Sequence, residues 1–250
     1  CTVHVVHRTG VGHRGAVGLG RPVKGPLQNL RPGSLVFSSI NMGATPGKFT
    51  SPRLLFLSEW TVQELRDFQK ELDSADFYFG LNLENLTYLL QDDGVAKDIL
   101  IEFAPKVLPD GDEPVVNSLA LLSAIAIICC LNENLHVSEA AAIIFEIHDL
   151  RQSDSMSLDE VTISIMSFFH ALKVVSAEPI ATIDQAQAEV IAKAIFESDE
   201  LAHGRCTKKA FACWTSDKVT EVHDEAGAGS TQDLHVHHLT EAFASFEPSS

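Results

Sequence analysis

Apolar residues recur with helical periodicity along most of this chain, and this repeat is the feature that most constrains its fold. The predicted helices come in pairs, each pair joined by about ten polar, turn-forming residues. The eight predicted helices cover residues 58–72, 83–91, 95–107, 118–130, 138–148, 158–172, 183–197 and 207–215. A recurring helix–loop–helix unit predicts an all-α fold, with a solenoid of unrelated helical hairpins as the alternative arrangement.

The composition agrees with a globular chain that buries an apolar core. The 250 residues are 45% hydrophobic, which is enough for one large or two small domains. The longest apolar run, 115–131, contains polar residues and is shorter than the roughly 20 residues that cross a bilayer, so no transmembrane segment is expected. Five cysteines, an odd number, suit a reducing intracellular compartment better than a disulfide framework.

Charge is distributed unevenly along the sequence. The net charge is −16, yet residues 1–58 contain no aspartate or glutamate. Glycine and proline are frequent in the same segment and disfavour long helices there. We therefore expect residues 1–54 to form an extended basic arm that binds an anionic partner. The predicted partner-binding residues are Arg8, Arg14, Arg21, Lys24, Arg31, Lys48 and Arg53.

Segment 143–161, IIFEIHDLRQSDSMSLDEV, contains the most distinctive motif. A twelve-residue loop from Asp149 to Glu160 follows the end of one predicted helix and carries the apolar Met156 at its eighth position. This motif resembles the EF-hand, in which a helix–loop–helix unit wraps a calcium ion with oxygens from loop positions 1, 3, 5, 7, 9 and 12. EF-hand proteins such as calmodulin, calcineurin B and the neuronal calcium sensors carry four such units in two lobes.

Three further units fit the same register when an apolar residue is placed at position eight. These residues are Leu81, Val116 and Cys206, in loops that begin at Ser74, Pro109 and Asp199. The helix after the second loop is similar to the apolar exit helix of calcineurin B-like and ciliary EF-hand proteins. The resemblance spans about residues 56–215 and implies two lobes of paired hands behind the arm. The implied division is 55–135 and 136–218 for the two pairs, with an acidic linker and a short amphipathic helix in 219–250.

The loops carry few of the oxygens that calcium needs. The candidate metal ligands that the resemblance implies are Asp149, Ser153, Ser157 and Glu160 of the third loop. Arg151 stands at position three, where its guanidinium repels a cation. Asp154 replaces the usual turn glycine at position six, a place that requires positive φ. Because the other loops lack more ligands, we expect no cofactor, or one weakly bound calcium ion.

Catalytic motifs are not found in the sequence, so we predict that the chain is not an enzyme. The glycine run at 10–20 lacks the flanking strand and helix of a phosphate-binding loop. The histidines at 235, 237 and 238 lack the paired spacing of a zinc site.

These patterns together predict a non-catalytic structural adaptor, largely insensitive to calcium, within a larger assembly. The arm would suit the acidic surface of tubulin, which favours a ciliary doublet microtubule, whereas nucleic acid is disfavoured because aromatic and basic residues are not interleaved. A groove between the helices would hold an amphipathic helix of a partner. The groove candidates are Phe103, Leu119, Leu122, Ile143, Phe145, Phe168, Phe169, Phe196 and Phe211.

The alternative is a calcium-responsive sensor, or a regulatory subunit of an enzyme, that uses the third hand. Arg151 distinguishes the two hypotheses, because an ion pair with Asp149 or Glu160 would close the loop without an ion. A cilium or the cytoskeleton is the favoured location. A plastid or mitochondrial complex remains an alternative, since an acid-free start also fits the remnant of a targeting segment. The first residue is Cys1 rather than methionine, so we expect further sequence upstream.

Overall fold

The computed structural model describes residues 52–77, 80–105, 113–175, 182–198 and 204–225, and structural statements below refer to these residues. They all belong to one compact unit, Ala44–Ser250. Most of the predicted arm and the whole of the predicted C-terminal amphipathic helix lie outside the described residues.

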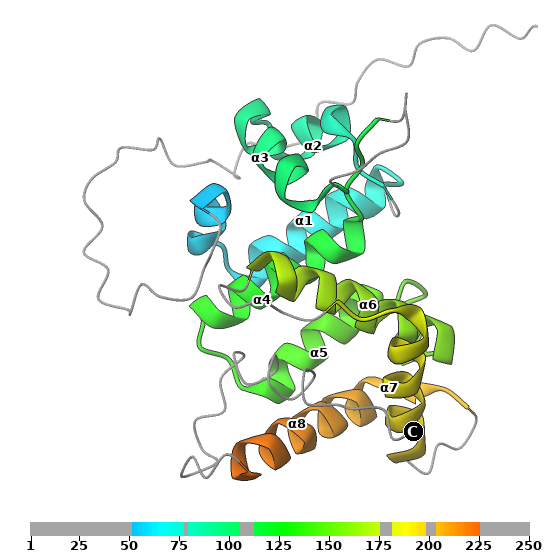
Figure 1. Ribbon diagram of the computed structural model, residues 1–250. Helices are drawn as coiled ribbons and strands as arrows, with labels where there is room; N and C mark the ends of the chain where they lie inside the picture. Colours follow the sequence, from blue (N-terminus) through cyan, green and yellow to red (C-terminus); the bar gives the residue numbers. More distant parts are fainter. Residues whose placement is uncertain (1–51, 78–79, 106–112, 176–181, 199–203, 226–250) are drawn as a thin grey trace, which may run out of the picture. The chain divides into compact units, whose positions relative to one another are not determined.

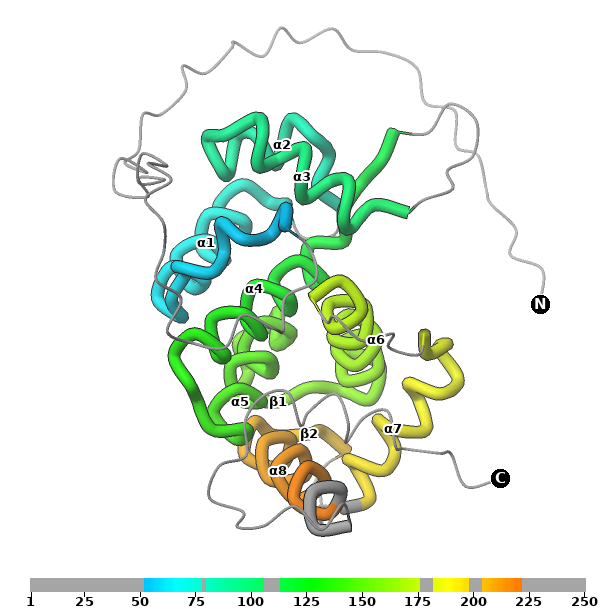
Figure 2. The backbone as a smooth tube through the Cα atoms, turned by 60° about the vertical axis from the view of Figure 1, so that its left-hand side comes forward, coloured from blue at the N-terminus to red at the C-terminus, as the bar shows by residue number. Residues whose placement is uncertain are grey.

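The described residues are mostly helical, as the sequence predicts (Figures 1 and 2). The elements are the 3-10 helix η1 (Pro52–Glu59), α1 (Val62–Ser74), α2 (Leu83–Leu90), α3 (Asp93–Phe103), α4 (Ser118–Asn132), α5 (Val137–His148), β1 (Ser155–Met156), α6 (Leu158–Val175), α7 (Gln185–Ser198), β2 (Cys206–Thr207) and α8 (Lys208–Glu225).

The start of the body differs from the prediction. The first helix was expected from residue 58, but α1 begins at Val62 because Thr61 caps it in a reciprocal capping box with Glu64. The preceding residues form η1, whose Leu54 and Leu57 are buried. The body therefore begins at or before Pro52, and the last residues assigned to the arm belong to it.

Helix α4 is buried on every side. Each residue from Ser118 to Cys130 is buried, and the helix contacts η1, α1, α5 and α6. A helix that is apolar all round is stable only inside a core, because no face of it suits water. At its end, the Asn132 amide donates to the carbonyl oxygens of Leu57 and Trp60, at 3.3 and 3.2 Å, which ties η1 to α4.

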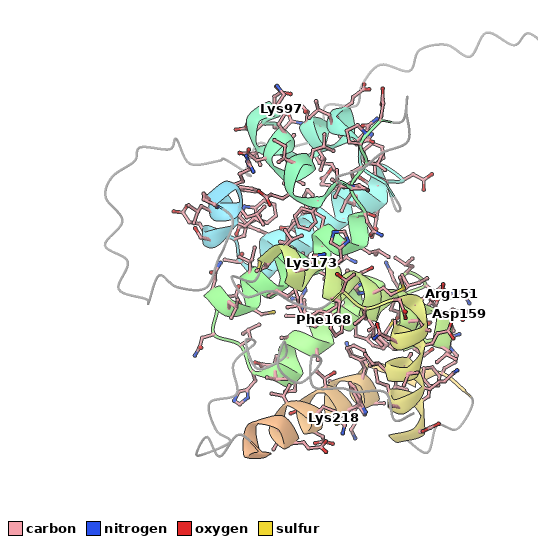
Figure 3. The ribbon with its side chains drawn as sticks, in the orientation of Figure 1. Lys97, Arg151, Asp159, Phe168, Lys173 and Lys218 are labelled. Carbon is pink, nitrogen blue, oxygen red and sulfur yellow. The ribbon has the colours of Figure 1, made fainter. Side chains whose placement is uncertain are left out.

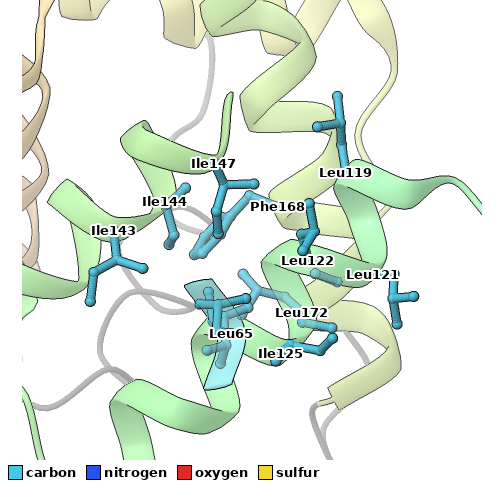
Figure 4. Packing of buried hydrophobic residues seen from close by; sticks show 14 of the residues in the cluster. Leu65, Leu119, Leu121, Leu122, Ile125, Ile143, Ile144, Ile147, Phe168 and Leu172 are labelled. Carbon is cyan, nitrogen blue, oxygen red and sulfur yellow. The ribbon is translucent and has the colours of Figure 1, made fainter. Parts of the chain in front are cut away.

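Most of the residues predicted to line a partner groove are buried in the core. Of the nine groove candidates, Phe196 is half-buried and the others are all buried in the core. Figure 4 shows Ile143 of α5 and Phe168 of α6 in the same cluster as Leu122 of α4. Two of these candidates, Leu119 and Leu122, lie on α4 itself, which packs against both α5 and α6. The two predicted pairs share one continuous core.

The C-terminal end of the body also departs from the prediction. The last helix was expected to end at 215 and a linker to follow, but α8 continues to Glu225. Burial explains the extension, because Trp214 and Val219 lie in the core one and two turns beyond Phe211. No helix in the described ranges is both long and apolar enough to cross a membrane.

We expect the shared core to make unfolding cooperative. Ile125 of α4 is fully buried, so Ile125→Ala should lower the free energy of unfolding by about 2–5 kcal/mol. The matched control is Ile101→Ala on α3, where the side chain is 57% exposed and the change should stay within about 1 kcal/mol. Urea unfolding followed by circular dichroism and by tryptophan fluorescence measures both. Two separate transitions in the wild-type chain would contradict the shared core.

Candidate functional site

The four loops meet in two pairs at equivalent positions. Leu81 and Val116 form an antiparallel bridge in which each N–H donates to the other's carbonyl oxygen at 2.9 Å. Met156 of β1 pairs in the same antiparallel manner with Cys206 of β2. Figure 2 shows the two short strands side by side. All four side chains are fully buried, and all four were placed at loop position eight from the sequence.

The residue after each paired position caps the next helix. In every unit a side-chain oxygen at position nine accepts a hydrogen bond from the backbone N–H at position twelve, which satisfies one of the free donors at the start of a helix. The pairs are Asn82 with Asn85 (2.9 Å), Asn117 with Ala120 (3.0 Å), Ser157 with Glu160 (3.3 Å) and Thr207 with Ala210 (3.2 Å). The repeat therefore consists of a paired residue followed by a cap.

In the third loop, 149–160, Asp149 holds the backbone turn. Its Oδ1 accepts from the N–H of Ser153 at 3.1 Å, and its Oδ2 accepts from the N–H of Asp154 at 2.7 Å. Asp154 has a φ of +54°, the positive value predicted for position six, and Gly204 has +66° at the same place in the fourth loop. Both carboxylate oxygens of Asp149 are thus engaged by the loop, and the residue is only 7% exposed.

Glu160 at the end of this loop binds two arginines. Its Oε1 lies 3.3 Å from Nε of Arg151, and its Oε2 lies 3.4 Å from Nη2 of Arg205. The same Oε2 accepts from the N–H of Ser157 at 2.7 Å. Burial alone would raise the pKa of Glu160, but the hydrogen bonds from Ser157 and the two guanidinium groups outweigh it and hold the pKa below its ordinary value.

Arg205 was not identified from the sequence. It lies at position seven of the fourth loop, yet its guanidinium reaches into the third. Its Nε donates to Ser155 Oγ at 2.8 Å and its Nη2 to the Ser155 carbonyl oxygen at 2.6 Å. Nη2 also lies 3.5 Å from Ser153 Oγ. Together with Glu160, these groups come from loop positions five, seven and twelve, which supply cation ligands in an EF-hand.

A signal for Arg205 was present in the register. The pairing of position eight of one loop with position eight of the other brings the preceding residue of each close to its neighbour's loop. A ligand count made within one loop does not include a positive side chain that the opposite loop contributes. The observed Arg151–Glu160 ion pair is the arrangement that the sequence linked to a loop closed without an ion.

The four predicted ligands come together in one loop, but their oxygens already have partners. Asp149 binds Ser153, and Glu160 binds Ser157. In the described part of the chain, no group of three or more His, Cys, Asp or Glu side chains could hold a metal ion. The three C-terminal histidines lie outside that part.

Of the seven predicted arm contacts, only Arg53 is described. Its side chain pairs with two acids of α3, Asp98 at 3.4 Å and Glu102 at 3.0 Å. Arg53 therefore anchors η1 to α3, and the six other residues lie outside the described ranges.

The chain was compared with protein-family models, with curated proteins and with solved structures, and no match was found.

His148 ends α5 directly before the third loop. Its ring is 2% exposed, and Nδ1 lies 2.8 Å from the carbonyl oxygen of Ile144, to which a neutral ring with hydrogen on Nδ1 donates. Burial lowers the pKa of this histidine to about 4. The buried ring is thus neutral at physiological pH and fixes the last turn of α5.

This histidine makes stability depend on pH. Below its ordinary pKa of 6.5, His148 of the unfolded chain takes up a proton while the folded ring stays neutral down to about 4. The contribution of His148 to the free energy of unfolding is therefore complete above pH 6.5. It should fall by about 3 kcal/mol as the pH approaches 4. The control is His148→Asn, whose amide can still donate to Ile144 but does not titrate. Urea unfolding of both chains at several pH values tests this, and parallel pH profiles would contradict it.

Proposed function

We propose that this chain is a non-catalytic adaptor built from four EF-hand-like units, in which arginine replaces calcium in the third unit. The observation that carries the proposal is the position of Arg205, whose guanidinium contacts Ser153, Ser155 and Glu160 together. A guanidinium supplies positive charge and several N–H donors, so it can satisfy oxygens that would otherwise require a cation.

The repeated geometry of the loops supports the EF-hand-like part of the proposal. Residues at equal positions pair with each other in an antiparallel manner, as expected when two equivalent units are related by a local two-fold axis. In a set of unrelated helical hairpins, we would not expect two pairings at the same loop position. Nor would we expect a capping side chain at the next position in all four loops.

The electrostatics of the third loop support calcium insensitivity. To bind there, a cation would have to separate Glu160 from both Arg151 and Arg205 and would then face two positive charges. Each ion pair is partly exposed and contributes modestly to stability. The barrier to calcium therefore lies in the repulsion and in ligands that already have partners.

The adaptor role also needs partners. The acid-free segment before Pro52 carries six basic residues, and the rest of the chain is strongly acidic. We propose that this arm binds an anionic protein surface, with tubulin of a ciliary doublet microtubule as the first candidate. Because eight of the nine groove candidates are buried in the core, the arm rather than a groove would provide the attachment.

A calcium titration of the full chain tests the arginine-closed loop. The wild-type chain should give no saturable heat up to about 5 mM calcium, because Glu160 is held by two guanidinium groups and Asp149 by N–H groups of the loop. The double variant Arg151→Asp, Arg205→Ser adds a carboxylate at position three and removes the second cation. It should bind one calcium ion with a dissociation constant between about 10 µM and 1 mM.

Two controls separate this effect from a general change in charge. Adding Asp149→Ala to the double variant should abolish the new binding. Lys193→Asp with Lys97→Ser makes the same net change on α7 and α3 and should remain silent. If the wild-type chain instead bound calcium at micromolar to sub-millimolar concentration, and Asp149→Ala removed that binding, the sensor hypothesis would replace the adaptor.

Co-sedimentation with microtubules tests the arm. Removal of residues 1–51 should reduce pelleting at least tenfold and leave the circular dichroism of the body unchanged. The cut stops before Pro52 because Arg53 and Leu54 contribute to the fold. A matched control replaces the six arm cations before Pro52 with glutamine at full length and should lose binding equally. Equal pelleting of the truncated and full-length chains would refute the role of the arm.

A further inference from the structure

Helix α6 carries an exposed stripe with charges of opposite sign at its two ends. Spacings of four and three residues place its members on one side of the helix. The stripe consists of Asp159, Ile163, Met166, His170 and Lys173, all exposed. Its two large apolar side chains are 48% and 38% exposed, and no other helix in the described ranges has two exposed large apolar side chains on one face.

This stripe is complementary to itself. When two copies of α6 lie antiparallel about a two-fold axis through Met166, Asp159 of each copy faces Lys173 of the other. The methionines then meet at the axis, and Ile163 faces His170. A two-fold interface requires this reciprocity, in which residue i meets residue j and j meets i. Figure 3 labels Asp159 and Lys173 toward opposite ends of α6.

We propose that the chain forms an antiparallel homodimer through this stripe of α6. The charges favour a second copy over an unrelated helix, because the antiparallel arrangement pairs Asp159 with Lys173 at both ends of the stripe. Asp159 has no ion pair within the described residues, and the Lys173 ammonium donates one hydrogen bond, to Thr182 at 3.0 Å, which leaves it further donors.

The dimer is weak by construction. We expect a single pair of helices to bury less than the roughly 1,200 Å² of a stable complex, and we expect a dissociation constant of about 10–100 µM, in the range of weak complexes. The net charge of −16 on each copy opposes association, so the measurement needs about 0.15 M salt, at which separated charges are screened beyond about 8 Å.

Sedimentation equilibrium of the full chain and three charge variants tests the pairing. Asp159→Lys should weaken the dimer about tenfold, because each end then places lysine against lysine. Lys173→Asp should do the same, and the combination of both changes should restore the wild-type constant. The control, Lys193→Asp on α7, should have little effect. A wild-type chain that stays monomeric at 200 µM, or a double variant that fails to recover, would overturn the proposal.

A cross-linking experiment locates the axis independently. In a background with Cys1→Ser and Cys213→Ser, Met166→Cys should form a disulfide-linked dimer under mild oxidation, since the two residues meet at the axis. The control, Ile101→Cys at an exposed position of α3, should not form this disulfide-linked dimer. Equal cross-linking of the two variants, or none with Met166→Cys, would count against α6 as the interface.

Discussion

The burial of α4 is the constraint on which the rest of this structure depends. Every residue from Ser118 to Cys130 is removed from water, so η1, α1, α5 and α6 must each offer it an apolar surface. Helix α6 meets this requirement by packing on α4; it also packs on α7 and keeps its remaining face in water. Neither predicted pair of units is complete without this helix, which belongs to the first pair in sequence and packs on the second.

A second constraint acts at the loops. An ion-binding loop usually contains many like charges that the ion neutralises. Here the positive charge is supplied by the chain itself. One guanidinium group comes from Arg151 of the third loop, and the other comes from Arg205 across the β1–β2 pair. Charge balance is therefore independent of the surrounding ion concentration, and it joins the two loops to each other.

The sequence was a good guide to whatever depends on local chemistry. Helix α2 was predicted almost to its last residue, and the capping box of Asn82 and Asn85 shows that its start is set by local chemistry. The positive φ of Asp154 followed from the loop register. The sequence could not reveal properties that depend on packing between distant elements. The burial of the groove candidates depends on the packing of α4 on α5 and α6, and the position of Arg205 depends on the pairing between two loops. The extra turns of α8 were missed for the same reason, because their polar residues hide the buried Val219.

The anchoring of η1 has a mechanical consequence for an attached arm. Residues before Pro52 join the body through a short helix that is fixed by the buried Leu54 and Leu57 and by the ion pairs of Arg53 with α3. A force pulling on the arm would be carried first by these contacts and only afterwards by α1. Because Asn132 ties η1 to the end of α4, tension would reach the central helix without passing through the third loop or its arginines.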